Sequence, residues 1–175
     1  MAILQEKQSA PFDEAVILAL GGNLAGDYRS PGALLEAAVS AAPQAGFRVL
    51  SRSSPWRSAA WPDPSEPDYI NIVAVVETPL AARQALAAAL ALERRFGRQR
   101  GRANAPRTLD VDLIAYGRLV IDEPGLVIPH PRAHLRRFVM GPLAEIVPAW
   151  RHPALGATAR ELADAATIGA DARPA

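Results

Sequence analysis

The residue pattern best suited to chemistry is a pair of aspartates, Asp110 and Asp112, in the run RTLDVD that begins at Arg107. If this run enters a strand, both side chains project from one face, with Cα atoms about 6–7 Å apart. Val111 and its apolar neighbours would then face the core. Two carboxylates on one face suit hard divalent cations and can clamp two Mg²⁺ ions against a polyphosphate. The alternative is a strand with a polar outer face and no metal.

Arginines crowd the segment before the aspartate pair: Arg98, Arg100, Arg102 and Arg107 fall within ten residues. A guanidinium group binds phosphate oxygens in bidentate fashion and keeps its charge. Lys7 is the only lysine, so any bound phosphate is held by arginines, backbone amides or metal. The alternative is an exposed basic loop or a weak nucleic-acid contact, but the aromatic residues that favour nucleic-acid binding are not interleaved here.

Aromatic and amide side chains indicate a second kind of ligand. Tyr69 and Asn71 share a face at the start of a predicted strand. A ring can stack on a flat heterocycle, while an amide both donates and accepts hydrogen bonds along its edge. Phe138 offers another aromatic platform. The alternative is a partly buried tyrosine with an asparagine in a turn.

Two familiar motifs are excluded by single positions. The glycines of GGNLAG, residues 21–26, are followed by Asp27 where a phosphate-binding P-loop needs lysine. This run instead predicts a turn at a strand end whose small residues allow close approach of a ligand. His130 and His134 are four apart, but Pro131 stands where a zinc protease has glutamate. We therefore expect a cluster of His and Arg side chains near phosphate.

The surrounding sequence predicts elements that position these residues. Their order, strand–helix–strand–strand–helix–strand, is the split βαβ pattern of a ferredoxin-like α+β sandwich, with an antiparallel sheet, two helices on one face and additional C-terminal helices. Long loops at 57–67 and 98–106 predict functional covers. We expect strands at 15–20, 47–56, 69–77, 109–116 and 126–128, and helices from Ser30-Pro31 to Gly46 and at 80–96, 138–146 and 157–166.

Composition limits the remaining possibilities. A length of 175 residues predicts one domain, which we place at 14–170 after a tail of residues 1–13. The net charge of +1 gives no general case for nucleic acid or an acidic membrane, and the lack of cysteine excludes disulfides and thiolate chemistry. Neither a signal peptide nor a run of about 18 apolar residues is present. We expect a cytoplasmic protein without a membrane or obligate protein partner.

Taken together, these segments resemble the 6-hydroxymethyl-7,8-dihydropterin pyrophosphokinase family. The run PRTLDVD is highly specific for that family, and the similarity covers about residues 15–165. Departures include Gly22, where the family usually has serine, and Asn104-Ala105, where tryptophan and glycine are common. In order, the similarity runs through GGNL at Gly21, PDYIN at Pro67, Glu93 with GRQR at Gly97, APRTLDVD at Ala105, PHPR at Pro129 and RRF at Arg136.

The resemblance implies roles for four sets of residues. Those that hold two Mg²⁺ ions are Asp110 and Asp112, and those that act in catalysis are Arg98, Arg107, Asp110 and Asp112. Those that bind ATP, with Arg100 closing over it from its loop, are Glu93, Arg98, Arg100, Arg107, His130 and Arg136. Those that bind the reduced pterin, with Tyr69 and Phe138 on either side of its ring, are Gly21, Asn23, Ser58, Tyr69, Asn71 and Phe138.

The implied reaction transfers pyrophosphate from ATP to the pterin hydroxymethyl group, releasing AMP, in folate biosynthesis. Two alternatives stay open on sequence alone. Another Mg²⁺-dependent nucleotidyl or phosphoryl transferase on the same scaffold would explain the aspartates but not Tyr69, Asn71 and Phe138. A non-catalytic module of RNA-binding type would need exposed aromatics on the central strands, where this chain has carboxylates.

Overall fold

The computed structural model describes residues 12–60, 63–98 and 106–175. Arg100 and Arg102 of the predicted arginine loop lie outside the described residues. The elements are β1 (Val16–Gly22), α1 (Pro31–Ala41), η1 (Ala42–Ala45), β2 (Arg48–Arg52), β3 (Trp56–Ser58), β4 (Tyr69–Glu77), α2 (Ala82–Arg95), β5 (Asp110–Tyr116), β6 (Ile121–Glu123), β7 (Leu126–Ile128), η2 (Ala133–Leu135), α3 (Arg137–Ile146), α4 (Ala159–Ala165) and β8 (Arg173–Pro174).

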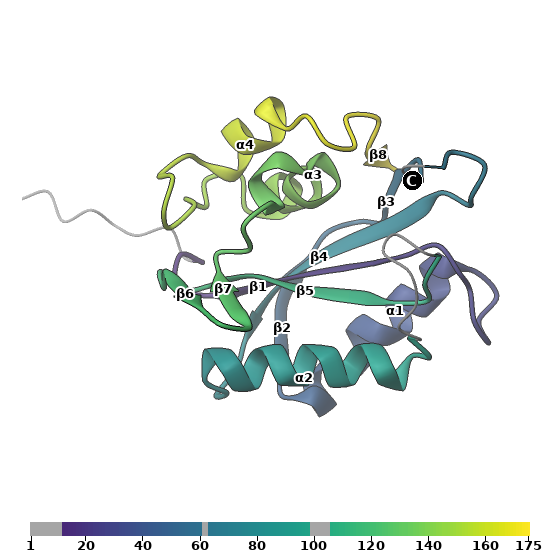
Figure 1. The fold of residues 1–175 in the computed structure, drawn as a ribbon, viewed down its shortest axis with the longest axis horizontal. Coiled ribbons are helices and arrows are strands. Elements are labelled where there is room, and N and C mark those ends of the chain that lie inside the picture. The colour runs from purple at the N-terminus through teal and green to yellow at the C-terminus, as the bar shows by residue number, and fades with distance from the viewer. Residues whose placement is uncertain (1–11, 61–62, 99–105) are drawn as a thin grey trace, which may run out of the picture.

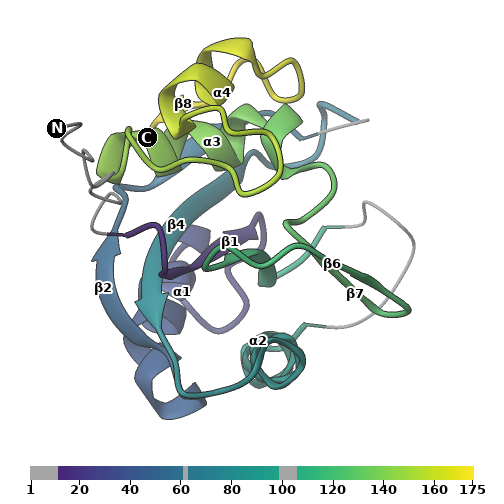
Figure 2. The ribbon, with the colours of Figure 1, turned by 90° about the vertical axis from the view of Figure 1, so that its left-hand side faces the viewer.

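A six-stranded sheet forms the centre, with strand order β5-β1-β4-β3-β8 and with β2 also paired to β4. Every one of these pairs is antiparallel. In Figure 1, α1 and α2 lie on one side of the sheet and α3 and α4 on the other, and Figure 2 shows the same layers from the side. The predicted α+β class, antiparallel sheet and C-terminal helices are therefore confirmed.

Two apolar layers hold the helices to the sheet, because successive strand residues point to opposite faces. On β4, Ile72, Ala74 and Val76 belong to the cluster that packs against α1 and α2. Val73 and Val75 belong to the cluster that packs against α3 and α4. The central strands are thus buried on both faces, which fixes their register and the direction of every polar side chain at their ends.

One predicted strand was wrong: residues 47–56 form two strands, β2 and β3, rather than one. Pro55 has no N–H to donate to a ladder. The Ser54 N–H and hydroxyl both donate to Glu145 of α3, at 2.7 and 2.8 Å. The chain therefore leaves the sheet at these residues and rejoins it at Trp56. In consequence, the loop predicted at 57–67 begins later, after Ser58.

Other boundaries follow local chemistry. Ser30 caps α1 by accepting from the Ala33 N–H, as predicted. Helix α2 begins at Ala82 instead of Leu80, because Ala81 is extended (φ −62°, ψ 158°) and its N–H donates to Gln84 Oε1 at 3.0 Å. Strands β6 and β8 were not predicted. Within the described ranges, no helix has the length and apolar character needed to cross a bilayer.

Candidate active site

The predicted metal and pterin residues meet on one face of three adjacent strands. Gly21 of β1 pairs with Asn71 of β4 on one side and with Asp110 of β5 on the other. Paired residues project to the same face and lie about 4.5–5.5 Å apart, so Asn71 and Asp110 are on the order of 10 Å apart across the glycine. A Cβ at Gly21 would lie 2.9 Å from Asn71 Oδ1. The absence of a side chain at Gly21 therefore lets the Asn71 amide lie close over the β1 backbone.

A second row lies next to the first, where Ala19 pairs with Val73 and Asp112. Val73 belongs to the apolar cluster on the α3 side, so this row and the aspartates face that side. Val111, between the aspartates, belongs to the cluster on the opposite face. Asp110 and Asp112 thus share a face, as the period of a strand requires.

Arginines neutralise both carboxylates. Asp110 Oδ1 accepts from Arg98 at 2.5 Å, and its Oδ2 accepts from Arg107 at 2.8 Å. Asp112 lies 3.6 Å from Arg136. The Asp110 side chain is 29% exposed and that of Asp112 36%, so both are open to a ligand. Three arginines and two carboxylates thus form one cluster that can bind phosphate and metal together.

Glu93 contacts the strand that carries the two aspartates. It lies near the end of α2, is only 5% exposed, and accepts the Val111 N–H at 2.8 Å. Burial raises the pKa of Glu93 to about 7; the charge of Asp110 raises it as well, against the Val111 N–H and Arg98, which lower it. The carboxyl group is therefore bonded to the backbone between the two aspartates and is partly protonated near neutral pH.

His130 and Asp112 influence one another across the site. Burial raises the pKa of Asp112, and the charge of Asp110 raises it further, while His130 and Arg136 lower it. Burial lowers the pKa of His130, and the charge of Asp112 opposes that change. The Nδ1 atom of His130 accepts from the Arg132 N–H at 3.2 Å. A neutral His130 therefore carries its proton on Nε2, which can donate to a ligand.

Two of the predicted pterin residues, Tyr69 and Phe138, lie against arginines of the same cluster. The Asn71 amide donates to the Ser58 hydroxyl at 3.3 Å, and both residues are buried. The Arg107 guanidinium lies 5.9 Å from the centre of the Tyr69 ring. The Arg136 guanidinium lies 5.7 Å from the centre of the Phe138 ring. Each aromatic ring thus adjoins an arginine that also contacts an aspartate.

Asn23 joins two segments that are far apart in the sequence. Its amide donates to the Pro67 carbonyl at 3.0 Å, and its Oδ1 accepts from the Arg107 N–H at 2.9 Å. A Cβ at Gly22 would lie 2.2 Å from the Thr108 carbonyl oxygen. At Gly22, the close approach predicted for a ligand is therefore made by the chain's own backbone. Sequence reasoning missed this contact because Thr108 is distant along the chain.

A cavity of about 370 Å³ opens beside the carboxylates. Its polar lining includes Glu93, Arg98, Asp110, Asp112 and His130. Its apolar lining includes Leu86 and Leu90 of α2 and Val127 of β7, which sequence reasoning did not assign to the site. Leu86 and Leu90 are four residues apart and half-buried on one helix face, and that spacing is a signal that could have indicated them.

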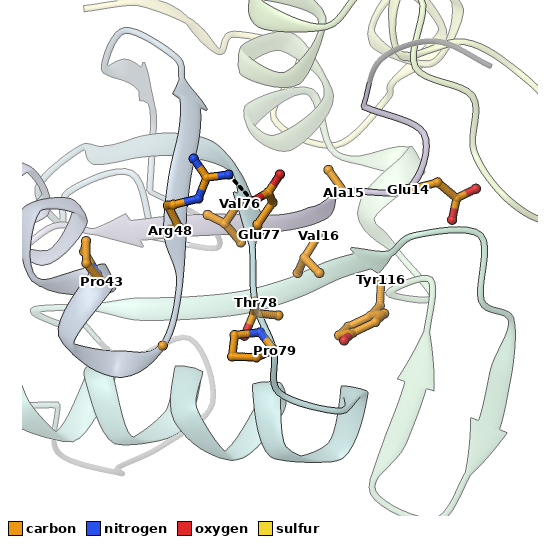
Figure 3. A pocket seen from close by; sticks show the side chains of 11 residues that line it. Glu14, Ala15, Val16, Pro43, Arg48, Val76, Glu77, Thr78, Pro79 and Tyr116 are labelled. Atoms are coloured by element: carbon orange, nitrogen blue, oxygen red, sulfur yellow. Dashed lines mark hydrogen bonds and ion pairs between the residues drawn. The ribbon is translucent and has the colours of Figure 1, made fainter. Parts of the chain in front are cut away.

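A larger hollow, of about 730 Å³, lies at the opposite end of the sheet. Figure 3 shows it from close by, with Arg48 and Glu77 pointing toward one another, and an ion pair joins them. Glu14 and Tyr116 also line it, and none of the predicted site residues that the structure describes is part of its lining. The smaller cavity is therefore the candidate active site, because it is the one that contains the carboxylates and arginines.

The donor atoms fit Mg²⁺. Within residues 12–60, 63–98 and 106–175, no group of three or more His, Cys, Asp or Glu side chains forms a metal cage. Mg²⁺ is commonly bound by one or two carboxylates, with substrate phosphates and water completing its shell. Asp110 and Asp112 offer that oxygen set on one face. The site thus suits a metal that arrives with a phosphate ligand.

Comparison with known proteins agrees with this chemistry. A family model described as 7,8-dihydro-6-hydroxymethylpterin-pyrophosphokinase (HPPK) matches residues 17–148. The 2-amino-4-hydroxy-6-hydroxymethyldihydropteridine pyrophosphokinase of Synechocystis sp. is 41% identical over 147 residues, covering 83% of this chain and 73% of the relative. The protein of that name from Haemophilus influenzae is 38% identical over 130 residues, which cover 74% of this chain and 79% of that relative.

Among solved structures, the chain is similar to wild-type Plasmodium falciparum HPPK-DHPS with pteroate. The TM-score is 0.67 at 12% identity, with 86% of this chain covered. The chain spans less than half of that protein, 44% of its length. At this identity the similarity concerns the fold, and it supports the arrangement of sheet and helices described above.

Proposed function

The chain belongs to the 7,8-dihydro-6-hydroxymethylpterin-pyrophosphokinase family, and we propose that its site transfers pyrophosphate from ATP to 6-hydroxymethyl-7,8-dihydropterin. The products are AMP and the pterin diphosphate, in folate biosynthesis. The observation that carries the proposal is the row Asn71, Gly21, Asp110 across three strands. It puts a group that binds a heterocycle edge next to groups that bind metal and phosphate. The family assignment does not favour the two alternatives considered above.

In the proposed reaction, the pterin hydroxymethyl oxygen bonds to the β-phosphorus of ATP and loses its proton. The bond from that phosphorus to the oxygen it shares with the α-phosphorus breaks, and AMP leaves. Such transfer depends chiefly on positioning and on neutralising charge. Arg98 and Arg107 supply guanidinium groups beside Asp110 for this purpose. Asp110 and Asp112 would hold Mg²⁺, two ions in our proposal, which would neutralise phosphate charge.

We place the nucleotide in the cavity between α2 and β7. Leu86, Leu90 and Val127 provide an apolar lining for a flat base. Glu93 and His130 lie along the same cavity and offer polar partners. We assign Arg136 to the phosphates, since it lies 3.6 Å from Asp112. We propose the closing role of Arg100 on sequence alone, because this residue lies outside the described ranges.

We place the pterin on the β4 side of the row. Asn71 would read its edge, and Tyr69 and Phe138 would stack on its ring. Gly21 leaves room for the Asn71 amide over β1, and Ser58 holds that amide by the 3.3 Å hydrogen bond. Asn23 joins the two segments beside the pocket through Pro67 and the Arg107 backbone. These contacts support a preformed pocket for a flat, polar-edged ring.

The finer architecture and setting are also proposals. The strand order and alternating directions agree with a ferredoxin-like βαββαβ core, in which β2 and β3 together take the place of one strand. We propose a single domain over residues 14–170 after the tail 1–13; β8 then adds residues 173–174 to the same sheet. A cytoplasmic location and the lack of an obligate protein partner rest on the sequence.

The decisive experiment combines purified protein, Mg²⁺, ATP and 6-hydroxymethyl-7,8-dihydropterin, and measures nucleotide products. AMP should form only when the pterin is present. Formation of ADP would instead indicate transfer of the γ-phosphoryl group, and AMP without pterin would indicate hydrolysis. Either result would contradict the proposed reaction.

A further inference from the structure

We propose that the C-terminal segment, residues 168–175, positions two walls of the pterin pocket: Phe138, and strand β3, whose Ser58 holds Asn71. This inference rests on the proposed function. The segment lies beyond residues 17–148, the stretch that matches the family model. In Figure 1 it runs from α4 past α3 to β8, which lies beside β3 at the sheet edge. It therefore connects the element that carries Phe138 with the element that carries Ser58.

The first wall is Phe138 at the start of α3. The Arg137 N–H donates to the Ile168 carbonyl at 2.9 Å, and the Ile168 N–H donates to the Leu135 carbonyl at 2.9 Å. A Cβ at Gly169 would lie 2.6 Å from Cδ1 of the Phe138 ring. Gly169 also has φ +64°, a conformation that favours glycine. The ring thus lies directly on the backbone of the segment, with no room for a side chain between them.

The second wall is β3. Strand β8 pairs Arg173 with Arg57 and Pro174 with Trp56. The Ala59 N–H donates to Asp171 Oδ2 at 2.6 Å. Ser58, the partner of Asn71, therefore stands between two residues that the segment holds in place. Without these contacts β3 would be an edge strand of three residues.

The two walls are joined by one short turn. The Ala172 N–H donates to the Gly169 carbonyl at 2.9 Å. The Ala172 carbonyl accepts from Arg137 Nε at 3.3 Å, and Ala172 is buried. The turn thus fixes Gly169, which contacts Phe138, relative to Asp171, which holds Ala59. In the described part of the chain, the hydrogen bonds of residues 168–175 do not reach the α2, β5 and β7 residues that line the proposed nucleotide cavity.

Ile168, at the start of the segment, bridges to Arg136, which we assign to the phosphates. A change at Asp171, at the β3 end of the segment, should therefore affect the pterin and spare the nucleotide. Asp171→Ala removes the acceptor of the Ala59 N–H, and loss of one hydrogen bond should raise KM for the pterin about three- to tenfold. Asp171→Asn keeps an acceptor oxygen and should restore most of the affinity. Asp164→Ala, an exposed change on α4, is the matched control. KM for ATP should stay within about twofold in all three variants.

Gly169→Ala tests the other wall. It places a Cβ against Phe138 and should raise KM for the pterin about tenfold, since a contact at 2.6 Å forces the ring to move. Gly156→Ala is its control, because Gly156 also has a positive φ, +72°, but nothing lies within 4 Å of its added Cβ. Both glycine variants should lose some thermal stability from backbone strain. Only Gly169→Ala should lose pterin affinity.

Steady-state kinetics with each substrate varied in turn, together with thermal unfolding, decides the matter. Unchanged KM for the pterin in both Gly169→Ala and Asp171→Ala would overturn the positioning role while leaving the proposed function intact. An equal rise in KM for both substrates would also overturn it, because that result indicates a general loss of structure. Absence of pterin-dependent AMP formation by the unmutated protein would contradict the proposed function, and with it the pocket itself.

Discussion

Replacing Glu93 with glutamine should stabilise the fold at alkaline pH and leave it nearly unchanged in acid. Glu93 is 5% exposed, and burial raises its pKa from 4.5 to about 7. The folded state therefore binds this proton more tightly than the unfolded chain does. The stability tied to the proton is complete below pH 4.5 and is lost as the pH rises through about 7.

The size of the effect follows from the rise in the pKa of Glu93. Each pKa unit corresponds to about 1.4 kcal/mol, so the change from 4.5 to about 7 corresponds to about 3 kcal/mol. Glutamine has no charge to bury, and its amide oxygen can still accept the Val111 N–H. Above neutral pH, the free energy of unfolding of Glu93→Gln should exceed that of the unmutated protein by an amount approaching this value.

Urea unfolding at about pH 5 and about pH 8.5 measures the difference between the two proteins at each pH. Glu161→Gln is a control of opposite sign, because backbone and side-chain hydrogen bonds from Thr158 lower the pKa of Glu161. That substitution should bring no gain at alkaline pH. If Glu93→Gln differs from the unmutated protein by the same amount at both pH values, then the burial argument is wrong. Lower stability of Glu93→Gln at alkaline pH would refute it as well.

Three further substitutions test separate parts of the site. Asp112→Ala should abolish AMP formation while the midpoint of thermal unfolding is maintained, since its carboxylate is a partly exposed metal ligand in our proposal and its pKa is already raised; appreciable turnover would count against the metal site. Asn71→Ala should weaken pterin binding about tenfold, measured by calorimetry, while ATP binding stays near normal. An equal loss of ATP affinity would mean that the pocket is wrongly assigned. Gly22→Ala should destabilise the fold by more than about 2 kcal/mol in urea unfolding, because its Cβ would lie 2.2 Å from the Thr108 carbonyl oxygen. Unchanged stability would show that this backbone contact is not required.

The sequence predicted the elements whose boundaries are set locally. Strand β4 runs over Tyr69–Glu77 as expected, because its apolar, β-branched run lies between Pro67 and Pro79. Helix α1 begins where Ser30 and Pro31 indicate. The aspartate pair shares a face because a strand has a period of two residues. In each of these cases the controlling residues are neighbours in the chain.

The sequence could not predict features that depend on distant partners. The break between β2 and β3 requires Glu145, which lies 91 residues beyond Ser54. Strand β8 has only two residues and contains a proline, so no local pattern indicates it. The contact between Gly22 and Thr108 requires that β1 and β5 be neighbours. These features depend on the topology of the sheet. The order of the elements along the chain limits that topology to a few possibilities but does not select one.

The ion pairs between arginines and aspartates bear on which ligands the site would bind. Asp110 accepts hydrogen bonds from Arg98 and Arg107, and Asp112 faces Arg136. A metal ion alone would compete with these arginines for the carboxylates, and a nucleotide alone would compete with the carboxylates for the arginines. In the proposed function, Mg²⁺ and ATP together would satisfy both sets, because the cation would take the place of the arginines at the aspartates and the phosphates would accept from the arginines. The ion pairs of Asp110 and Asp112 would thus favour the metal–nucleotide complex over either component alone.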